Sequence, residues 1–308
     1  MVYEFILSHE HHYPVLAMCN ALSVSRSCYY AYKSKATYVK KAGEVVLEEQ
    51  VTATFRAHYS RYGVRRLVPE LRGQDIRAGA YKVRRILRDH GLKAIQPRSF
   101  VPHTTDSRHP YPISPNLLGK PGCNQVERLN QVWAGDITFI PLQGKWAYLA
   151  VWMDLCSRKV VGWALAEHMR EELVMTALKR ALASRHINEG LIIHSDRGGQ
   201  YAGNMFRKLL AGRKIRQSMT GKDNPYDNAF MESYFSRFKA ELLQGSVFEK
   251  LEDARTEVFE FIEMYYNPIR RHSSLGYISP MTFEQQMAFQ QKRRMDKKKK
   301  SSKKRKTG

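Results

Sequence analysis

Three carboxylates stand where the surrounding sequence predicts regular structure. Asp136 interrupts an apolar strand pattern over residues 132–140, and Asp196 closes a short, largely apolar segment that begins at residue 191. Glu232 lies near the start of a helical pattern. A carboxylate buried without a partner costs free energy, so such a group pairs, takes up a proton or holds a metal ion.

Oxygen ligands without a histidine or cysteine cage favour a hard divalent cation, Mg²⁺ or Mn²⁺. Two such cations activate a water or hydroxyl nucleophile and stabilise the leaving oxygen in phosphoryl transfer. We therefore expect Asp136, Asp196 and Glu232 to be the catalytic residues and to bind two metal ions per active site. This chemistry is typical of nucleases and polynucleotidyl transferases.

A cation is spaced to act beside one of these carboxylates. Lys239 follows Glu232 by seven positions. Seven residues make about two helical turns, so both side chains are expected on one face of a helix. A ligand for metal and a contact for phosphate would then project together.

Two other features near the carboxylates have plainer interpretations. Asp154 is a possible fourth acidic residue, but an Asp at a strand end more often closes a turn, here with Ser157. Gly198 and Gly199 follow Asp196 and could cradle phosphate. We favour a positive-φ turn for this pair of glycines.

The charge of the chain indicates a polyanionic partner. The 308 residues carry a formal net charge of +22. Residues 292–308 contain 11 Lys or Arg and one Asp and so contribute +10, which leaves +12 for the rest. Basic character spread this widely is typical of nucleic-acid binding. An anionic membrane surface is the rival partner, but no long apolar stretch or signal pattern supports it.

The cysteines indicate which cellular compartment and which kind of metal site to expect. The four cysteines form no CxxC pair. We therefore expect neither a disulfide framework nor a zinc site, and we expect a cytoplasmic protein.

Two helical modules are predicted at the N-terminal end. Residues 1–35 predict a small unit that is either a helix-turn-helix or a plain pair of helices. Residues 40–95 predict a second module, of helix-turn-helix type, that binds DNA. Its last helix has apolar residues at helical spacing and ends near Gly91.

Three arginines, Arg84, Arg85 and Arg88, lie largely off the apolar stripe of that last helix. They form either a solvated helix face or a phosphate-contacting face. Given the overall charge, we favour contact with DNA phosphates.

A linker and a tail flank the expected catalytic region. Residues 96–130 hold six of the twelve prolines, so we expect an extended linker that is poorly folded on its own. Residues 292–308 are low-complexity and basic, which predicts a disordered tail that binds nucleic acid or acts as an address signal.

The catalytic region is expected at residues 131–245, with a C-terminal helical extension at residues 246–291. The predicted strands lie near 131–142, 146–154, 159–166, 190–196 and 214–219. The predicted helices lie near 170–186, 203–212, 229–244 and 251–266. Short adjacent strands followed by alternating helices and strands predict an α/β fold with a mixed five-stranded sheet flanked by helices.

Several segments together resemble a known family. They are Trp133-Ala134-Gly135-Asp136-Ile137-Thr138, Met153 to Trp163, His194-Ser195-Asp196-Arg197-Gly198-Gly199-Gln200-Tyr201, Asn224 to Ala229, and Tyr266 to Pro280. This set resembles the retroviral-integrase-type catalytic core of DDE transposases. The most similar group is the second-frame product of bacterial insertion sequences of the "insertion sequence three" type.

The resemblance implies an RNase H-like fold in which neighbouring strands carry Asp136 and Asp196 and a helix with Glu232 packs across them. It implies that Asp136 bridges both metals, while Asp196 and Glu232 hold one each. Lys239 would contact DNA near the cleaved end, and we expect Arg197 to contact DNA as well. The implied reaction is hydrolysis at an element end followed by attack of the freed 3′-OH on target DNA.

The resemblance also implies partners. They are double-stranded DNA at the element ends and target, further copies of this chain on the DNA, and a first-frame product with a helix-turn-helix and a leucine zipper. Two other functions stay open. The chain could be a non-catalytic DNA-binding partner or regulator of a longer fusion, or an RNase H-like nuclease that cuts DNA without joining it.

Overall fold

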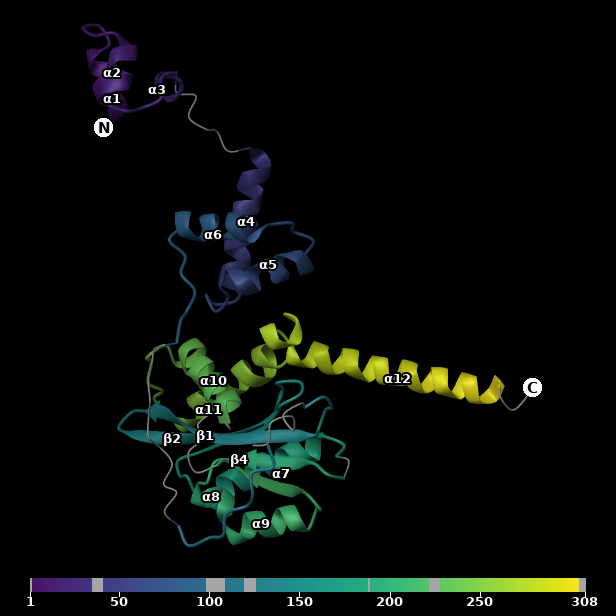
Figure 1. Ribbon diagram of the computed structural model, residues 1–308. Coiled ribbons are helices and arrows are strands. Elements are labelled where there is room, and N and C mark those ends of the chain that lie inside the picture. The colour runs from purple at the N-terminus through teal and green to yellow at the C-terminus, as the bar shows by residue number, and fades with distance from the viewer. Residues whose placement is uncertain are drawn as a thin grey trace.

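The structure is a computed structural model of the chain. It describes residues 2–34, 41–97, 109–118, 126–187, 189–221 and 228–304, with side chains as far as residue 293. Figure 1 shows a sheet with helices on both sides, helical modules toward the N-terminus and a long C-terminal helix.

A mixed five-stranded sheet forms the centre of the catalytic region and confirms the predicted fold class. The strands are β1 (Val132–Leu142), β2 (Lys145–Asp154), β3 (Val160–Ala166), β4 (Ile192–Ser195) and β5 (Arg216–Met219). Their order is β3-β2-β1-β4-β5. The pairs β1–β2 and β2–β3 are antiparallel, whereas β1–β4 and β4–β5 are parallel. This is the RNase H-like arrangement that the resemblance implied.

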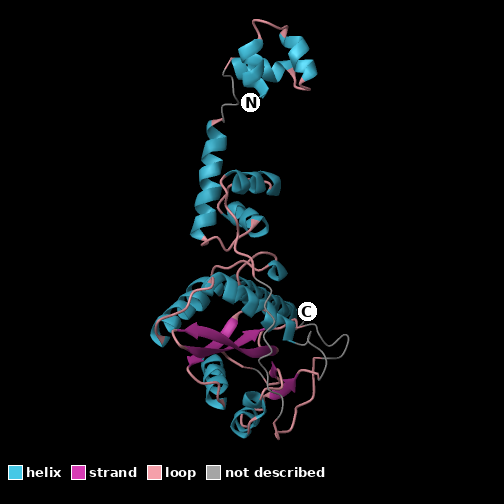
Figure 2. Cartoon of the chain, turned by 90° about the vertical axis from the view of Figure 1, so that its left-hand side faces the viewer, coloured by secondary structure: helices cyan, strands magenta, loops and turns pink. Residues whose placement is uncertain are grey.

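Helices cover both faces of the sheet, as Figure 2 shows. One face holds α7 (Glu171–Ser184), α8 (Gly199–Ala202) and α9 (Asn204–Ala211). The other holds α10 (Ala229–Phe238), its π-helical continuation η2 (Lys239–Leu243), α11 (Leu251–Phe259) and the π-helical segment η3 (Glu260–Tyr266). Alternation along β1 divides the two cores, because Trp133 packs on the α7 side while Val132 and Ala134 pack on the α10 side.

A glycine next to Asp136 makes room for an aromatic ring. Gly135 pairs with Trp152 across β1 and β2. A Cβ at this position would lie 2.2 Å from the Trp152 ring. A glycine at position 135 therefore leaves the space that the buried Trp152 ring occupies beside β1.

The first N-terminal module is a three-helix unit with its own small core. It consists of α1 (Val2–His9), α2 (Val15–Ala21) and α3 (Arg26–Lys33). Ile6, Met18, Cys19 and Tyr29 fill that core. The predicted pair of helices is present, and α1 is an additional helix that the sequence reasoning did not predict.

The second module packs against the catalytic region. It contains α4 (Ala42–Ala57), α5 (Val64–Gly73) and α6 (Ala80–Asp89), and it shares the larger hydrophobic core with α10 and η3. Tyr62 donates a hydrogen bond to the carbonyl of Ile269 at 3.3 Å, and Arg271 pairs with Glu70 at 2.6 Å. The two parts are therefore joined by polar contacts as well as by apolar burial.

Residues 109–118 of the proline-rich linker lie beside β5 in the parallel half of the sheet. Ser114 donates to the side-chain oxygen of Gln217 at 2.9 Å, and the Leu117 backbone N–H donates to Ser218 Oγ at 2.9 Å. The remaining linker residues, 98–108 and 119–125, lie outside the described part of the chain.

The C-terminal part ends in a long helix. After the short helix η4 (Ser273–Leu275), α12 runs from Pro280 to Lys304. Helical backbone therefore extends well into residues 292–308, where the composition predicted disorder. Lys, Arg, Gln and Met are good helix formers, and the segment lacks an interior Gly or Pro. None of the described helices combines the length and the hydropathy needed to cross a lipid bilayer.

Candidate active site

The two aspartates emerge from neighbouring parallel strands at the same height. Ala134 of β1 pairs with His194 of β4. Asp136 and Asp196 each lie two residues beyond this pair, and adjacent strands are about 4.8 Å apart. Because side chains alternate along a strand, Asp136 faces the same side as Ala134, which is the side that α10 covers.

Helix α10 carries the third carboxylate over this face. Met231, Phe235 and Phe238 anchor α10 in the core that it shares with β1. Glu232 is exposed beside this buried stripe, and Lys239 is partly buried at the start of η2. The helix thus holds both predicted functional side chains next to the sheet rather than within the core.

The electrostatics of Asp136 link all four predicted residues. Burial raises the pKa of Asp136 well above its usual range, and the negative charges of Asp196 and Glu232 raise it further. The N–H of Ile137, 2.8 Å from Asp136 Oδ1, and the cation of Lys239 act in the opposite direction. Burial lowers the pKa of Lys239, and Asp136 opposes that shift. Charges at the end of β4, on α10 and on η2 therefore all act on Asp136 in β1.

The donor chemistry fits a hard divalent cation. The charges of Asp196 and Glu232 raise the pKa of Asp136, and a bound divalent cation would relieve that repulsion. In the part of the chain that the structure describes, no three His, Cys, Asp or Glu side chains are grouped closely enough to hold a metal ion. Asp136, Asp196 and Glu232 would therefore have to come closer together to share a metal ion.

Asp154 has the structural role that its strand-end position predicted. Its carboxylate is fully buried and accepts hydrogen bonds from the backbone N–H groups of Asn130, Cys156 and Ser157 at 2.7, 2.8 and 3.1 Å. It lies opposite Trp133, on the other face of the sheet from Asp136. The prediction that Asp154 closes a turn with Ser157 is confirmed.

The loop after Asp196 differs from its prediction. Gly198 has φ −61°, so the expected positive-φ turn at the glycine pair is wrong. Space explains the glycine instead, because a Cβ there would lie 2.8 Å from Gln200 Oε1 and 3.1 Å from Asp196 Oδ1. The N–H of Gly198 donates to that same Asp196 oxygen at 3.0 Å and so orients the carboxylate.

Arg197 has a contact within the protein. Its Nε donates to the carbonyl of Thr220 at 2.8 Å, and its own carbonyl lies 2.7 Å from His109 Nε2 in the linker. The side chain therefore ties the loop after β4 to the end of β5. Its contact with DNA stays a prediction.

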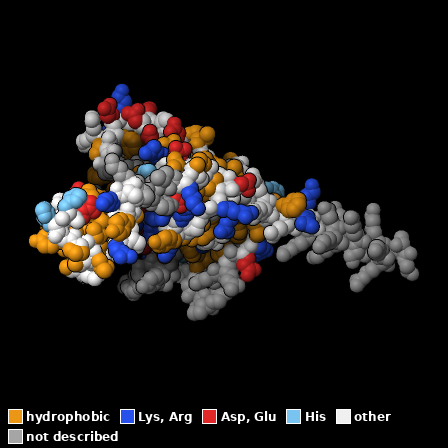
Figure 3. Space-filling model, turned by 90° about the horizontal axis from the view of Figure 1, so that it is seen from above, with side chains coloured by type: hydrophobic (Ala, Val, Ile, Leu, Met, Phe, Trp, Pro, Cys, Tyr) orange, Lys and Arg blue, Asp and Glu red, His pale blue; other side chains and the backbone are white. Residues whose placement is uncertain are grey.

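The predicted DNA-contacting arginines lie on α6. Arg84 and Arg88 are exposed, Arg85 is partly buried, and Arg88 is 3.5 Å from Asp89. Their stripe faces away from the buried Val83, as the sequence pattern predicted. Figure 3 shows Lys and Arg side chains distributed across the face seen from above, so positive charge is available well beyond α6.

Two groups were missed by sequence reasoning. Tyr201 is buried beside the aspartates, and burial followed by the charges of Asp136 and Asp196 raises its pKa well above the usual range. Its only sequence signal was its place in the segment after Asp196. The second group is a set of four arginines around α10. They gave no sequence pattern, because they are far apart in the chain: Arg66, Arg158, Arg237 and Arg270.

Three segments of the chain match known family models. Residues 126–225 and residues 213–280 each match an integrase core domain, and residues 44–100 match an HTH-like domain. Together these matches cover the helical module α4–α6, the sheet and the segment beyond α10.

Curated relatives match over most of the chain. It is 38% identical over 288 residues to the transposase InsF of insertion sequence IS3A from Escherichia coli (strain K12), covering 93% of this chain and 99% of that relative. It is 37% identical over 244 residues to the transposase of insertion sequence element IS904 from Lactococcus lactis subsp. lactis (strain IL1403), covering 78% and 94%.

Solved structures show weaker similarity. The simian T-cell lymphotropic virus intasome in complex with PP2A regulatory subunit B56 gamma has a TM-score of 0.43 and 17% identity, over 73% of this chain and 71% of that chain. The catalytic core domain of BIV integrase has a TM-score of 0.40 and 16% identity, over 53% and 98%.

Proposed function

Because this chain belongs to the IS3 family of insertion-sequence transposases, given its 38% identity to one such protein over 93% of its length, we propose that it cuts and joins DNA by DDE chemistry. In the first step a water oxygen attacks the phosphorus at an element end, and the 3′ oxygen leaves with a proton. In the second step this 3′-OH attacks a phosphorus of target DNA. One phosphodiester bond forms as another breaks, and the displaced 3′ oxygen takes the proton.

The three carboxylates are the proposed catalytic residues and metal ligands. Asp136 would contact both of two Mg²⁺ or Mn²⁺ ions, and Asp196 and Glu232 would hold one each. Such ions, when bound, lower the pKa of the attacking water and neutralise the leaving oxygen. Asp136 is the natural shared ligand because the charges of both other carboxylates act on it.

Lys239 is the proposed contact for the phosphate being cut. It carries the cation whose charge acts on Asp136, and it lies on the same helical stretch as Glu232. Its position would place a positive charge beside the carboxylate cluster, where a polyanionic strand must approach three negative groups.

The single observation that carries this proposal is the electrostatic link of Asp136 with Asp196, Glu232 and Lys239. Charged side chains from three other elements act on Asp136, in a chain whose family acts on DNA. Mutual repulsion of carboxylates opposes folding unless a proton, a basic side chain or a metal ion relieves it, and this arrangement supports a role in binding metal.

The helical module and the oligomer complete the proposal. The HTH-like module would bind element ends through Arg84, Arg85 and Arg88, with Arg197 as a further contact in the core. Two ends must be held together for joining, so we propose that several copies of the chain assemble on DNA. The first-frame product of the same element is a further proposed partner.

Strand joining is the decisive test. The full chain is incubated with labelled duplex DNA of the element end, target plasmid and Mg²⁺ or Mn²⁺, and joined products are separated by electrophoresis. We expect joined products that disappear with EDTA. Cutting without joining would indicate a nuclease, and binding without either reaction would indicate a regulator.

A further inference from the structure

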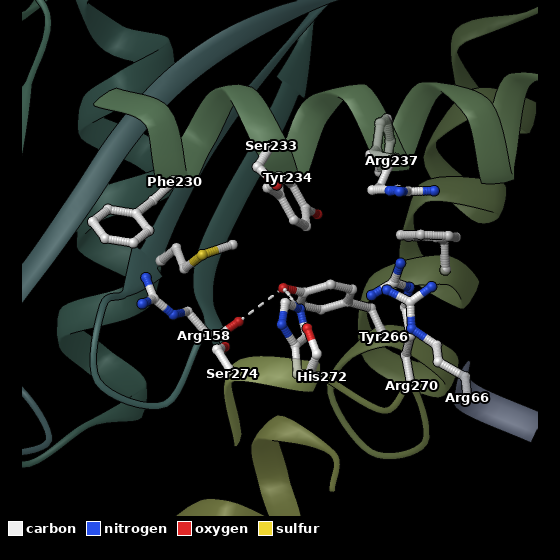
Figure 4. Close-up of a pocket in the computed structure, with 14 residues that line it drawn as sticks. Arg66, Arg158, Phe230, Ser233, Tyr234, Arg237, Tyr266, Arg270, His272 and Ser274 are labelled. Carbon is white, nitrogen blue, oxygen red and sulfur yellow. Dashed lines mark hydrogen bonds between the residues drawn. The ribbon is translucent and has the colours of Figure 1, made fainter. Parts of the chain in front are cut away.

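A cavity of about 320 Å³ lies between α10, the turn after β2 and residues 266–274. Figure 4 shows side chains from α10 and from the segment 266–274 pointing into it from opposite sides. The lining residues that matter here are Arg66, Arg158, Phe230, Tyr234, Arg237 and Arg270. The first of them belongs to the helical module, so the pocket forms where that module meets the catalytic region.

Four arginines line this pocket, with Arg158 beside Phe230 at one end and Arg66, Arg237 and Arg270 toward the other, as Figure 4 shows. They come from α5, the turn between β2 and β3, α10 and the segment after η3. Arg270 pairs with Glu241, 2.6 Å away. Within the described ranges, no Asp or Glu lies within ion-pair distance of Arg66, Arg158 or Arg237. The pocket therefore holds more positive charge than its own carboxylates balance.

Two buried polar groups in the pocket have no hydrogen-bond partner. Arg158 Nη1 is one, although its guanidinium stacks 4.0 Å over the Phe230 ring. The hydroxyl of Tyr234, whose side chain is 5% exposed, is the other. A buried donor without a partner is costly, so both groups are suited to an external acceptor.

The lowered pKa of His272 is a second sign of the excess positive charge in the pocket. Burial, followed by the charges of Arg270, Arg66 and Arg158, lowers its pKa to about 3. Its Nε2 lies 3.0 Å from the hydroxyl of Tyr266. A neutral His272 adds no further positive charge to the pocket, and an anion in the pocket would raise its pKa.

We propose that this pocket binds a phosphate group of the DNA backbone, separate from the phosphate that is cut. Guanidinium groups bind phosphate oxygens in a planar, two-point geometry, and a pocket with unbalanced arginines selects an anion with several acceptor oxygens. The identity of the strand rests on the proposed function, whereas binding of a phosphate does not.

The position of the pocket on α10 relates it to the catalytic site. Phe230, Ser233 and Arg237 follow one another at intervals of three and four residues and line the pocket. Glu232 and Lys239 form a second stripe, about two-fifths of a turn around the helix axis. A strand that crosses the exposed side of α10 can therefore place one phosphate in the pocket and another at the carboxylates.

Paired substitutions in the full-length chain test the proposal. R158Q and R237Q, alone and together, remove charge from the pocket without touching the carboxylates. Binding of a fluorescent duplex is measured by anisotropy over a range of salt concentrations. We expect the double variant to bind roughly tenfold more weakly. The slope of log K against log salt should fall by about 0.9, the value for one phosphate contact.

A matched control keeps this result interpretable. Arg207 is exposed on α9, on the opposite face of the sheet, so R207Q loses the same charge outside the pocket. Its affinity and salt slope should stay close to those of the unmodified chain. Thermal unfolding of each variant shows whether it is folded. If R158Q alone unfolds, R237Q carries the test, because no hydrogen bond or ion pair within the described chain depends on Arg237.

Two results would overturn the proposal. One is unchanged affinity and slope in folded R158Q/R237Q. The other is a folded variant that still binds DNA but no longer self-associates when DNA is absent. That result would mean that the pocket binds a carboxylate from a second copy of the chain. If the unmodified chain joins no DNA but the variants still lose affinity and slope, the proposed reaction fails and the phosphate pocket stands.

Discussion

Arg270 and Glu241 form a fully buried ion pair with two hydrogen bonds. Arg270 Nε donates to Glu241 Oε2 at 2.8 Å, and Nη2 donates to Oε1 at 2.6 Å. Both side chains are 2% exposed. The backbone carbonyl of Glu241 also accepts a hydrogen bond from Arg61 at 3.2 Å. The pair thus connects the helical module, the continuation of α10 and the segment after η3.

Removing one partner of this ion pair should destabilise the contact between the helical module and the catalytic region. E241Q leaves the Arg270 charge buried against a neutral amide, and removing one partner of a buried pair costs about 3–5 kcal/mol. We expect the free energy of unfolding in urea to fall by about 3 kcal/mol, and E241M/R270M to recover much of that loss. The control is E257Q on the exposed side of α11, where a change within about 0.5 kcal/mol is expected. Equal loss in E257Q and E241Q would contradict the assigned role of the pair.

Neutral substitutions should separate catalysis from binding. D136N, D196N and E232Q each keep the side-chain shape but remove a hard anionic ligand. We expect cleavage and joining to fall by roughly 10⁴-fold or more in each variant, the scale found when a catalytic group is lost. DNA affinity measured by anisotropy should change little, because it depends on Lys and Arg contacts.

Asp154 supplies the matched comparison for these variants. D154N removes charge from a buried turn that holds three backbone N–H groups. It should lower the unfolding temperature, while the fraction that stays folded keeps joining DNA. A folded D154N as inactive as D136N would require a fourth catalytic carboxylate.

The sheet was predictable because its strands are apolar runs with clear ends. Each observed strand begins and ends within two residues of its prediction, as with β4 at Ile192–Ser195 for the predicted 190–196. The long predicted helix 229–244 was placed correctly, but the prediction did not include its change from α-helical to π-helical geometry. Its second part is the π-helical η2, and sequence periodicity does not separate that from an α-helix over five residues.

The features that were not predicted depend on tertiary contacts between distant segments, and no local sequence pattern indicates such contacts. The aspartates could be proposed from the sequence because each breaks an apolar run, whereas the arginine pocket draws on Arg66, Arg158, Arg237 and Arg270 from four separate segments. The docking of the helical module was also missed, since Glu70 and Arg271 are 201 positions apart. Short helix α1 gave too few turns for a periodic signal.

The arginines of α6 should contribute to affinity through phosphate contacts. Arg84 and Arg88 are exposed and lie off the buried stripe of the helix. In R84Q/R88Q we expect weaker binding of element-end duplex, with a salt slope smaller by about 1.8 because each phosphate contact contributes about 0.9. K179Q/R207Q, with the same charge loss on α7 and α9, should leave the slope unchanged. The same reduced slope in both pairs would mean that only net charge matters.

The contact between the helical module and the catalytic region should weaken at low pH, because Glu70 takes up a proton there. The contact with His58 Nε2 at 3.7 Å, followed by the hydrogen bond from Arg271, holds the pKa of Glu70 at about 2, against an ordinary value of 4.5. A carboxylate with a lowered pKa in the folded state stabilises the fold above pH 4.5 and loses that contribution as the pH falls toward 2. At neutral pH, E70Q should therefore be less stable by roughly 1–2 kcal/mol, after discounting for the partial exposure of the site. In urea titrations at successive pH values, the gap between E70Q and the unmodified chain should close between pH 4.5 and pH 2. The exposed E249Q should show no such gap, and a gap for E70Q that stays constant with pH would rule out the Glu70 charge as its cause.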